Sequence, residues 1–272
     1  MEVSPTFRSF ITNLTIPNKE KISYRYKKIT KRLNQEYWND DSSEKHSLMI
    51  GSYGRKTAIK DVSDLDMAFI LPNEIYNKYD GYEGNGQSAL LQDVKNRIKK
   101  TYSDTDVKGD GQVVVIKFTD YVIEVLPAFE NKDNSFTHPD SNEGGCWRVT
   151  KPREEMTAID SRNVRTNGNL KRLAKMVRAW KNKVGAPMGG LLIDTLCYNF
   201  FNSSTYDNTS YSKYDEMSRD FFDYLRSLDK EQKFWLAPGS NQQVYKAGNF
   251  APKAKKVKIV ICELVDSGSP CN

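Results

Sequence analysis

Apolar positions recur at helical spacing soon after a lead-in that ends near Pro17. These positions are Ile22, Tyr26, Ile29, Leu33 and Tyr37, with lysines and arginines between them. The pattern predicts a basic amphipathic helix over residues 18–38, with Asn18 as its N-cap. The basic face of this helix is either solvated or in contact with nucleic acid.

Short apolar runs bounded by polar residues predict strands in the first half of the chain. The predicted strands cover 47–50, 67–71, 112–118 and 121–126. Thr119-Asp120 makes a tight turn between the last two, and Pro127 ends the final strand. A loop with Tyr76, Tyr79 and Tyr82 follows the second strand and leads to a helix over 88–102. Residues 130–168 are predicted to be irregular, with a short strand near 147–152.

The pattern becomes helical in the second half of the chain. Residues 170–183 carry an apolar stripe formed by Leu170, Leu173, Ala174, Val177 and Trp180. A buried helix over 191–201 and a helix over 217–228 follow, separated by a polar loop at 202–214. The apolar run at 257–265 is of uncertain type. We therefore predict a mixed α/β lobe over residues 1–150 and a mainly helical lobe over 151–272, with a site in the cleft between them.

Composition does not change this division, but it bears on the partners and the cellular compartment of the protein. The 272 residues are 38% hydrophobic and 28% charged, with a net charge of +6 and a pI near 8.9. This balance fits a nucleotide or nucleic-acid partner. No apolar run is long enough for a membrane span, and the start does not resemble a secretory signal. The four cysteines are far apart, so neither a zinc site nor a disulfide framework is indicated, and we expect a cytoplasmic protein.

Two aspartates open the strand over 67–71. Side chains alternate along a strand, so Asp64 and Asp66 point the same way, roughly 7 Å apart along the chain. Neighbouring carboxylates repel each other and resist ionising. A divalent cation removes that cost, and Mg²⁺ prefers oxygen ligands of this kind and also binds phosphate oxygens. Alone, such a pair is often just two solvated aspartates at a strand edge.

A Gly-Ser turn lies twelve residues before the first aspartate in the sequence GSYGRKTAIKDVSDLD. Its backbone N–H groups and the Ser52 hydroxyl are suited to holding a phosphate. Arg55, Lys56 and Lys60, which follow, either meet phosphates or form a solvated loop. In this order, the turn and the aspartates predict a metal-dependent site for nucleoside triphosphates.

Glu124 stands inside the otherwise apolar strand over 121–126. A carboxylate there is costly unless a partner compensates for it. It either pairs with a nearby lysine or serves as a third metal ligand.

The predicted helix after Leu170 belongs to a stretch that lacks acidic residues. Between Asp160 and Asp194 there are eight basic residues, namely Arg162, Arg165, Lys171, Arg172, Lys175, Arg178, Lys181 and Lys183. Lys171, Lys175 and Arg178 share one helix face at spacings of four and three. A solvated helix usually mixes signs, so a triphosphate or an acidic substrate is a reasonable complement.

Four segments together resemble the DNA polymerase β-like nucleotidyltransferase superfamily. The resemblance is greatest to the bacterial enzymes similar to cyclic GMP–AMP synthase and oligoadenylate synthase, which make nucleotide second messengers in anti-phage defence. In chain order the segments are GSYGRKTAIKDVSDLD, VIEVLPAF, LKRLAKMVRAWK and GGLLIDTLCYNFF. The last includes an acidic residue, Asp194, at the family's position, and the alignment spans about residues 15–230.

The resemblance implies an α+β fold in which a polymerase β-like core, a mixed sheet flanked by helices, packs on a mainly helical C-terminal lobe. It also implies two Mg²⁺ ions, with Mn²⁺ as an alternative, held by the catalytic carboxylates Asp64, Asp66 and Glu124. The implied nucleotide-binding residues are Gly51, Ser52, Tyr53, Lys175 and Arg178. The substrates would be nucleoside triphosphates, ATP among them, and the product a cyclic di- or trinucleotide that acts on a downstream receptor effector.

The chain departs from the family pattern at several positions. Glu124 stands where many relatives have aspartate. Leu191 occupies the place of a tyrosine that stacks on the base in animal relatives, so stacking must come from elsewhere, such as Tyr53. No zinc-binding insertion is present. The alternatives are a nucleotidyltransferase acting on RNA ends, a transferase of AMP to a protein or antibiotic, and a catalytically inactive nucleotide sensor.

Overall fold

The computed structural model describes residues 3–17, 19–60 and 64–255. The predicted N-cap Asn18 and the apolar run at 257–265 lie outside these residues. The chain divides into two compact units. We call Pro17–Gly54 with Ser63–Arg153 the α/β unit, and Met1–Ile16 with Arg55–Val62 and Glu154–Asn272 the helical unit. The boundary after Arg153 lies close to the division predicted near residue 150, but the N-terminal segment and Arg55–Val62 cluster with the helical unit.

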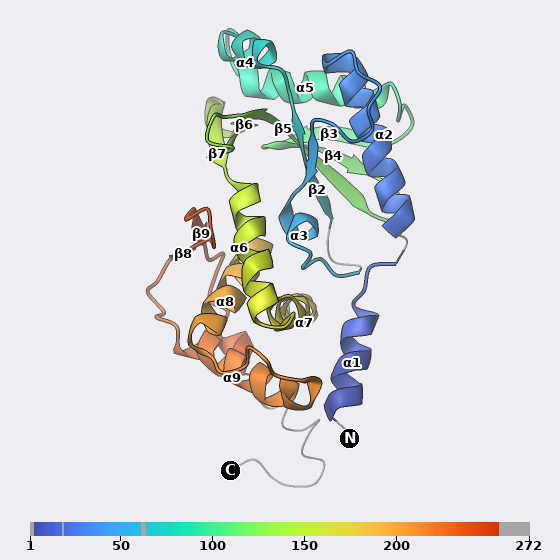
Figure 1. Ribbon diagram of the computed structural model, residues 1–272. Coiled ribbons are helices and arrows are strands. Elements are labelled where there is room, and N and C mark those ends of the chain that lie inside the picture. Colours follow the sequence, from blue (N-terminus) through green and yellow to red (C-terminus); the bar gives the residue numbers. More distant parts are fainter. Residues whose placement is uncertain (1–2, 18, 61–63, 256–272) are drawn as a thin grey trace. The chain divides into compact units, whose positions relative to one another are not determined.

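The α/β unit is built on a mixed seven-stranded sheet with the central order β1-β2-β5-β4-β3 (Figure 1). β2 and β5 run parallel, and the other neighbours are antiparallel. β6 pairs with the end of β5, and β7 pairs with β6. The strands are β1 (Ser47–Met49), β2 (Leu65–Ile70), β3 (Asp106–Asp110), β4 (Val113–Lys117), β5 (Val122–Glu130), β6 (Phe136–Asp140) and β7 (Cys146–Thr150).

At the start of the central strands β2 and β5, fully buried apolar side chains alternate with less buried ones. Leu65 and Met67 of β2 and Ile123 and Val125 of β5 are fully buried. The helices against the sheet are α2 (Lys19–Tyr37), which contacts β2, and α5 (Gly86–Lys99), which contacts β3 and β4. The intervening residues of β2 and β5, at positions 66 and 124, therefore lie on the opposite face.

The helical unit has a core of its own. Tyr214, Phe221, Leu173 and Leu196 are almost completely buried in it. Its helices are α1 (Val3–Asn13), α6 (Pro152–Arg165, whose first two residues belong to the α/β unit), α7 (Asn169–Val184), α8 (Gly190–Ser203) and α9 (Tyr214–Ser227), with the short η2 (Tyr211–Lys213) and a hairpin of β8 (Phe234–Leu236) and β9 (Gln243–Tyr245). Among the residues described, no helix is long and apolar enough to cross a membrane.

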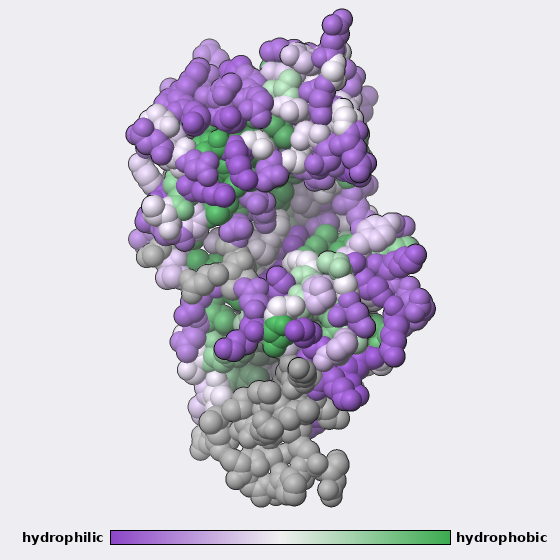
Figure 2. All heavy atoms as spheres, turned by 180° about the vertical axis from the view of Figure 1, so that it is seen from behind, coloured by the Kyte–Doolittle hydropathy of each residue, from purple (hydrophilic) through white to green (hydrophobic). Residues whose placement is uncertain are grey.

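Several predicted elements are confirmed. α2, α5, α7, α8 and α9 lie where the apolar spacing placed helices, and β1, β2 and β4 lie where it placed strands. Hydrophilic residues cover most of the face shown in Figure 2, with apolar residues in small groups between them.

The prediction that Pro127 ends its strand is wrong, because β5 continues to Glu130. On one side β5 pairs with β2 over residues 123–128, and on the other side it pairs with β4 up to Val125 and with β6 from Phe129 onward. Pro127 lies between these two partners. A strand tolerates a proline where no neighbour needs its N–H group, so the strand continues.

Three segments predicted as loops or lead-in contain regular structure. The lead-in holds α1, the loop after β2 holds α4 (Asn73–Asp80), and the stretch over 130–168 holds β6, α6 and the 3-10 turn η1 (Asn142–Gly144). In that stretch β7 confirms the short strand expected near 147–152. α4 and α6 carry acidic residues in the first turn and basic ones in the last, and α6 opens with Pro152. Charges at the two ends of such a helix interact favourably with the helix dipole and stabilise it. A search for apolar residues at helical spacing does not detect these helices.

Candidate functional site

The parallel pairing of β2 and β5 brings the predicted carboxylates together. Asp66 lies directly opposite Glu124 in the register of the two strands. Parallel neighbours are about 4.8 Å apart, and residues opposite each other project from the same face. Asp64 lies two residues before Asp66, so it projects from this face as well. Asp64 is exposed, whereas Asp66 and Glu124 are half-buried.

Glu124 has several acidic neighbours, one of which, Asp110, pairs with Lys108 at 3.4 Å. Burial raises the pKa of Glu124, and the charges of Asp66, Asp64 and Asp110 raise it further. Burial also raises the pKa of Asp64. In the described part of the chain, no lysine forms an ion pair with Glu124. Asp110, at the end of β3, is an acidic neighbour that the sequence motifs did not point to.

The Gly-Ser turn packs directly on this carboxylate pair. It forms a single helical turn, α3 (Gly51–Gly54), after β1. Gly51 has a φ of +58°, and a Cβ atom there would lie 1.8 Å from Oδ2 of Asp66. The Ile50 N–H donates to the Asp66 carbonyl oxygen at 2.9 Å. Only glycine permits both this backbone conformation and this close approach.

Tyr53 places a phenol beside the same carboxylates. Burial raises its pKa to about 12, and the nearby Tyr121, Asp64 and Asp66 contribute to this rise. Its hydroxyl therefore stays protonated at neutral pH and can act as a hydrogen-bond donor. The α/β unit thus brings together Gly51, Ser52, Tyr53, Asp64, Asp66 and Glu124.

The donor chemistry of this face fits a hard divalent cation, since carboxylate oxygens are the ligands that Mg²⁺ prefers. The mutual repulsion acting on Glu124 is the cost that a bound cation would remove. Within residues 3–17, 19–60 and 64–255, no group of three or more histidine, cysteine, aspartate or glutamate side chains is arranged to hold a metal ion. The metal-ligand role of the three carboxylates stays a prediction.

Lys175 and Arg178, the other predicted nucleotide-binding residues, belong to α7 in the helical unit. Lys175 lines an open basic pocket of about 500 Å³. The remaining lining residues are Lys56, Asp160, Asn163, Val164, Gly168, Lys171 and Arg172. Asp160 forms ion pairs with both Lys56 and Lys171, which leaves the pocket with a net positive charge.

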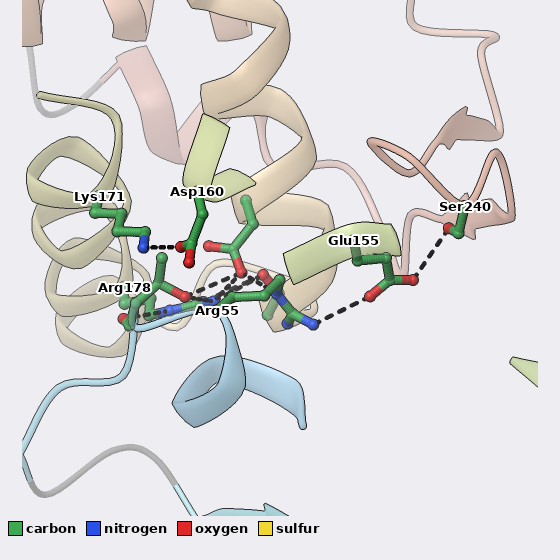
Figure 3. A network of polar contacts seen from close by, with 9 residues as sticks. Arg55, Glu155, Asp160, Lys171, Arg178 and Ser240 are labelled. Atoms are coloured by element: carbon green, nitrogen blue, oxygen red, sulfur yellow. Dashed lines mark hydrogen bonds and ion pairs between the residues drawn. The ribbon is translucent and has the colours of Figure 1, made fainter. Parts of the chain in front are cut away.

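Arg178 lies in a buried ion cluster, shown in Figure 3. It is 4% exposed, and its guanidinium donates to Asp194 at 2.6 Å, to the carbonyl oxygen and hydroxyl of Thr57 at 2.9 Å each, and to the Gly190 carbonyl oxygen. Arg55 donates to the same Asp194 at 2.7 Å and to Glu155 at 3.2 Å. A role for Arg178 in phosphate binding stays a prediction, whereas its contacts with protein groups are present in the structure.

Sequence reasoning missed this cluster. It treated Arg55 as a phosphate contact or a solvated loop residue, but Arg55 is only 5% exposed and is bound to two carboxylates. Thr57 and Glu155 were not singled out. The acidic residue in the segment GGLLIDTLCYNFF was the available signal, because an aspartate inside an apolar helix needs cationic partners.

The part of the chain that contains the Gly-Ser turn and the carboxylates matches a known protein family. A model of the Second Messenger Oligonucleotide or Dinucleotide Synthetase domain, SMODS, matches residues 1–163. The chain belongs to this family. The SMODS match contains the Gly-Ser turn and all three carboxylates, which belong to the first two of the four motifs. Together with the relatives that follow, it confirms the resemblance to bacterial enzymes similar to cyclic GMP–AMP synthase.

Among curated proteins, a probable cyclic nucleotide synthase of Bacillus cereus (strain VD146) is 22% identical over 213 residues, which cover 67% of this SMODS chain. The match covers 62% of the length of that relative.

Solved structures share the fold of this SMODS protein. The CdnE cyclic dinucleotide synthase of Elizabethkingia meningoseptica, with GTP and Apcpp, has a TM-score of 0.70 at 12% identity and covers 97% of this chain and 98% of its own. CdnC of E. coli MS115-1 with ATP has a TM-score of 0.72 at 12% identity, and the match covers 99% of this chain and 94% of CdnC. The DncV cyclic AMP-GMP synthase of Vibrio cholerae has a TM-score of 0.60 at 14% identity, and the match covers 82% of this chain and 64% of DncV. The predicted α+β fold with a mixed sheet and flanking helices is confirmed.

Proposed function

We propose that this SMODS protein is a metal-dependent nucleotidyltransferase that joins nucleoside triphosphates into a cyclic di- or trinucleotide and releases pyrophosphate. The observation that carries the proposal is the register of β2 and β5, which sets Asp66 opposite Glu124 with Asp64 on the same face and Gly51 against Asp66. The family to which the chain belongs and the similar proteins from Bacillus cereus, Elizabethkingia meningoseptica and Vibrio cholerae, which are named as cyclic nucleotide synthases, support the same reaction.

The carboxylates Asp64, Asp66 and Glu124 would hold two Mg²⁺ ions. Bound there, Mg²⁺ would supply Lewis acidity at the α-phosphate and neutralise the charge of the triphosphate. The half-buried position of Asp66 and Glu124 limits water around these charges, which strengthens their electrostatic interactions.

The turn at Gly51 and Ser52 would position the phosphates. Because Gly51 has no side chain, nothing separates its backbone from the Asp66 carboxylate. The Ser52 hydroxyl and nearby N–H groups could then donate to the β- and γ-phosphates. Tyr53, beside the carboxylates, would contact the base or ribose.

Lys175 would contribute positive charge toward the triphosphate. Its pocket also contains Lys56, Lys171 and Arg172 against the single carboxylate of Asp160. Cations next to transferring phosphates stabilise the charge that develops on the leaving group.

The bond changes follow from these placements. A 2′- or 3′-hydroxyl of the acceptor gives its proton to water, and its oxygen bonds to the α-phosphorus. The bond from that phosphorus to the bridging oxygen breaks, and pyrophosphate leaves. A second round on the linear intermediate closes the ring. In phosphoryl transfer the protein contributes mainly position and charge, which these residues supply.

The biological setting belongs to the same proposal. We infer a cytoplasmic second-messenger role in anti-phage signalling, with a downstream receptor effector. The family description supports the second-messenger part of this inference. Nucleoside triphosphates, ATP among them, are the proposed substrates, because relatives have been solved with ATP, GTP and analogues.

The test is to incubate the purified protein with Mg²⁺ and the four radiolabelled nucleoside triphosphates, singly and mixed, and then with phosphatase before chromatography. A phosphatase-resistant product is expected, and an Asp64→Ala/Asp66→Ala variant should not form it. Replacing Mg²⁺ with EDTA should abolish the product as well.

Label that transfers only to added RNA or to protein in cell extract would overturn the cyclic product in favour of an RNA-end or AMP transferase. Binding of Mg²⁺-nucleotide without any transfer would instead identify a sensor. A product that persists in the double variant would contradict the assigned carboxylates.

A further inference from the structure

Three consecutive residues after the Gly-Ser turn are each held by side chains of the helical unit. Arg55 donates to Asp194 at 2.7 Å. Lys56 pairs with Asp160 at 2.9 Å. The Thr57 hydroxyl donates to Asp194 at 3.0 Å, and the Thr57 carbonyl oxygen accepts from Arg178 at 2.9 Å. A segment in which every residue is anchored in this way has little freedom to move.

Asp194 is the centre of these contacts. It is completely buried, and its Oδ2 accepts from Arg55, Arg178 and the Thr57 hydroxyl. Glu155, which binds Arg55 and the Ser240 hydroxyl, supplies a second carboxylate, so two arginines face two acids (Figure 3). A buried charge pair is strongly destabilised when one partner is lost, so the contacts act as a unit.

The middle residue of the anchored segment has an unusual backbone conformation. Lys56 has a φ of +59°, in the left-handed region that residues with a Cβ atom rarely adopt. Such a conformation persists only where surrounding contacts impose it, and it occurs often at functional sites. The contacts at Arg55 and Thr57 provide that constraint from both sides.

We propose that Asp194, Arg178, Arg55 and Thr57 form a clamp of positioning residues for the Gly-Ser turn. The clamp fixes residues 55–57, and Arg55 is bonded directly to Gly54, the last residue of α3. Because Gly51 approaches Asp66 without room for a methyl group, a small shift of the turn displaces the carboxylate or opens the contact. The inference rests on the proposed nucleotidyl transfer, and it assigns Arg178 to positioning the turn in place of the phosphate contact expected from the sequence.

A pair of substitutions at Thr57 tests the clamp without removing a charge. Thr57→Val keeps the size of this buried side chain but loses the hydroxyl that joins Arg178 to Asp194. Thr57→Ser keeps the hydroxyl and loses only a methyl group. Arg226→Ala, which removes an exposed ion pair with Asp223 on α9, is the surface control.

Steady-state kinetics gives the first measurement. We expect Thr57→Val to lower kcat by on the order of 10-fold or more with KM changed less than about twofold, because misplaced groups cost rate more than binding. Thr57→Ser should recover most of the activity, and Arg226→Ala should resemble the wild type. Wild-type kcat in a folded Thr57→Val protein would overturn the clamp.

Hydrogen exchange gives a second measurement that does not depend on activity. In Thr57→Val, backbone amides of residues 50–57 should exchange faster, while those of α8 and α9 keep their wild-type rates. Unchanged exchange over residues 50–57, or an equal increase throughout the helical unit, would overturn the clamp. If the wild type makes no product, the proposed reaction fails, and the exchange result still decides the clamp.

Discussion

At the scale of single residues, Gly51 leaves no room for a side chain beside the proposed metal ligands. Its φ is +58°, and the methyl group of an alanine there would overlap the Asp66 carboxylate. Gly185, which ends α7, has a φ of +60° with open space around it. The two glycines therefore share one backbone constraint and differ in what lies beside them.

This difference predicts the effects of two alanine substitutions. Gly51→Ala should abolish product formation, because its methyl group pushes Asp66 out of line with Glu124. Gly185→Ala should keep activity and lose about 1–2 kcal/mol of stability from the left-handed backbone alone. Product assays and thermal unfolding of both variants provide the measurement. Equal activity in the two variants would show that the contact with Asp66 is unimportant.

We expect the Glu124 carboxylate to lower the stability of the folded protein while serving the proposed metal site. Its pKa is raised in the folded protein, mainly by burial and then by Asp66, Asp64 and Asp110. A raised carboxyl pKa means that the folded state binds the proton more tightly than the unfolded state. The favourable contribution of Glu124 to the free energy of unfolding is therefore fully present at pH values below its pKa in the unfolded chain. It is lost as the pH rises through its pKa in the folded protein.

Glu124→Gln should accordingly raise the unfolding temperature at pH 7 in EDTA, since it removes a charge that the fold disfavours. The same variant should lose Mg²⁺-induced stabilisation and on the order of 10³-fold or more in rate, equivalent to several kcal/mol of barrier. Thermal unfolding from pH 4 to 8, with EDTA or Mg²⁺, separates the two effects. A variant that is less stable than the wild type in EDTA at pH 7 would contradict this explanation.

At the scale of elements, α7 has two functions on one helix. Its apolar residues Leu170, Leu173 and Val177 are buried in the core, as their spacing predicted. Arg178, expected on the basic face, is buried and holds the segment at Thr57, whereas Lys175 lines the basic pocket. Spacing places a residue on a helix face, but it does not say whether that face meets solvent or a buried carboxylate.

The basic pocket predicts how two substitutions on α7 differ. Lys175→Ala should raise KM for the nucleotide several-fold with little change in kcat, and the effect should shrink at high salt because screening weakens the charge. Lys181→Ala, in the last turn of the same helix, is the control and should not change KM. KM measurements at two ionic strengths test this expectation. Equal effects of the two substitutions would indicate a general charge effect.

The elements that were predicted and those that were missed differ in a physical way. α2, α7 and α9 bury one apolar stripe each, so periodicity alone identifies them. α4 and α6 have mixed surfaces and are marked mainly by charges at their ends. Strand alternation predicted that Asp64 and Asp66 lie together, and the family resemblance added Glu124 as a third carboxylate. The register that sets Glu124 opposite Asp66 came only from the structure. Asp110 and the Asp194 cluster depend on contacts between distant segments, which a single sequence does not specify.

At the scale of the whole molecule, the chain interleaves its two units. The segment Arg55–Val62 belongs to the helical unit, yet it connects the Gly-Ser turn to the strand of Asp64 and Asp66 in the α/β unit. Residues proposed to bind one nucleotide therefore occur in both units. Each unit has buried residues of its own. Hydrogen exchange in each unit can therefore show separately whether the ligand contacts that unit.

Hydrogen exchange with a non-hydrolysable ATP analogue and Mg²⁺ tests that arrangement. Ligand binding slows local opening where the ligand makes contacts, so exchange should slow over residues 50–54 and 122–126 in the α/β unit and over residues 171–178 in α7. In Lys175→Ala the protection over 171–178 should weaken while that over 50–54 remains. Protection confined to the α/β unit of the wild type would remove Lys175 from the nucleotide site and leave the carboxylates and the Gly-Ser turn as the whole of it.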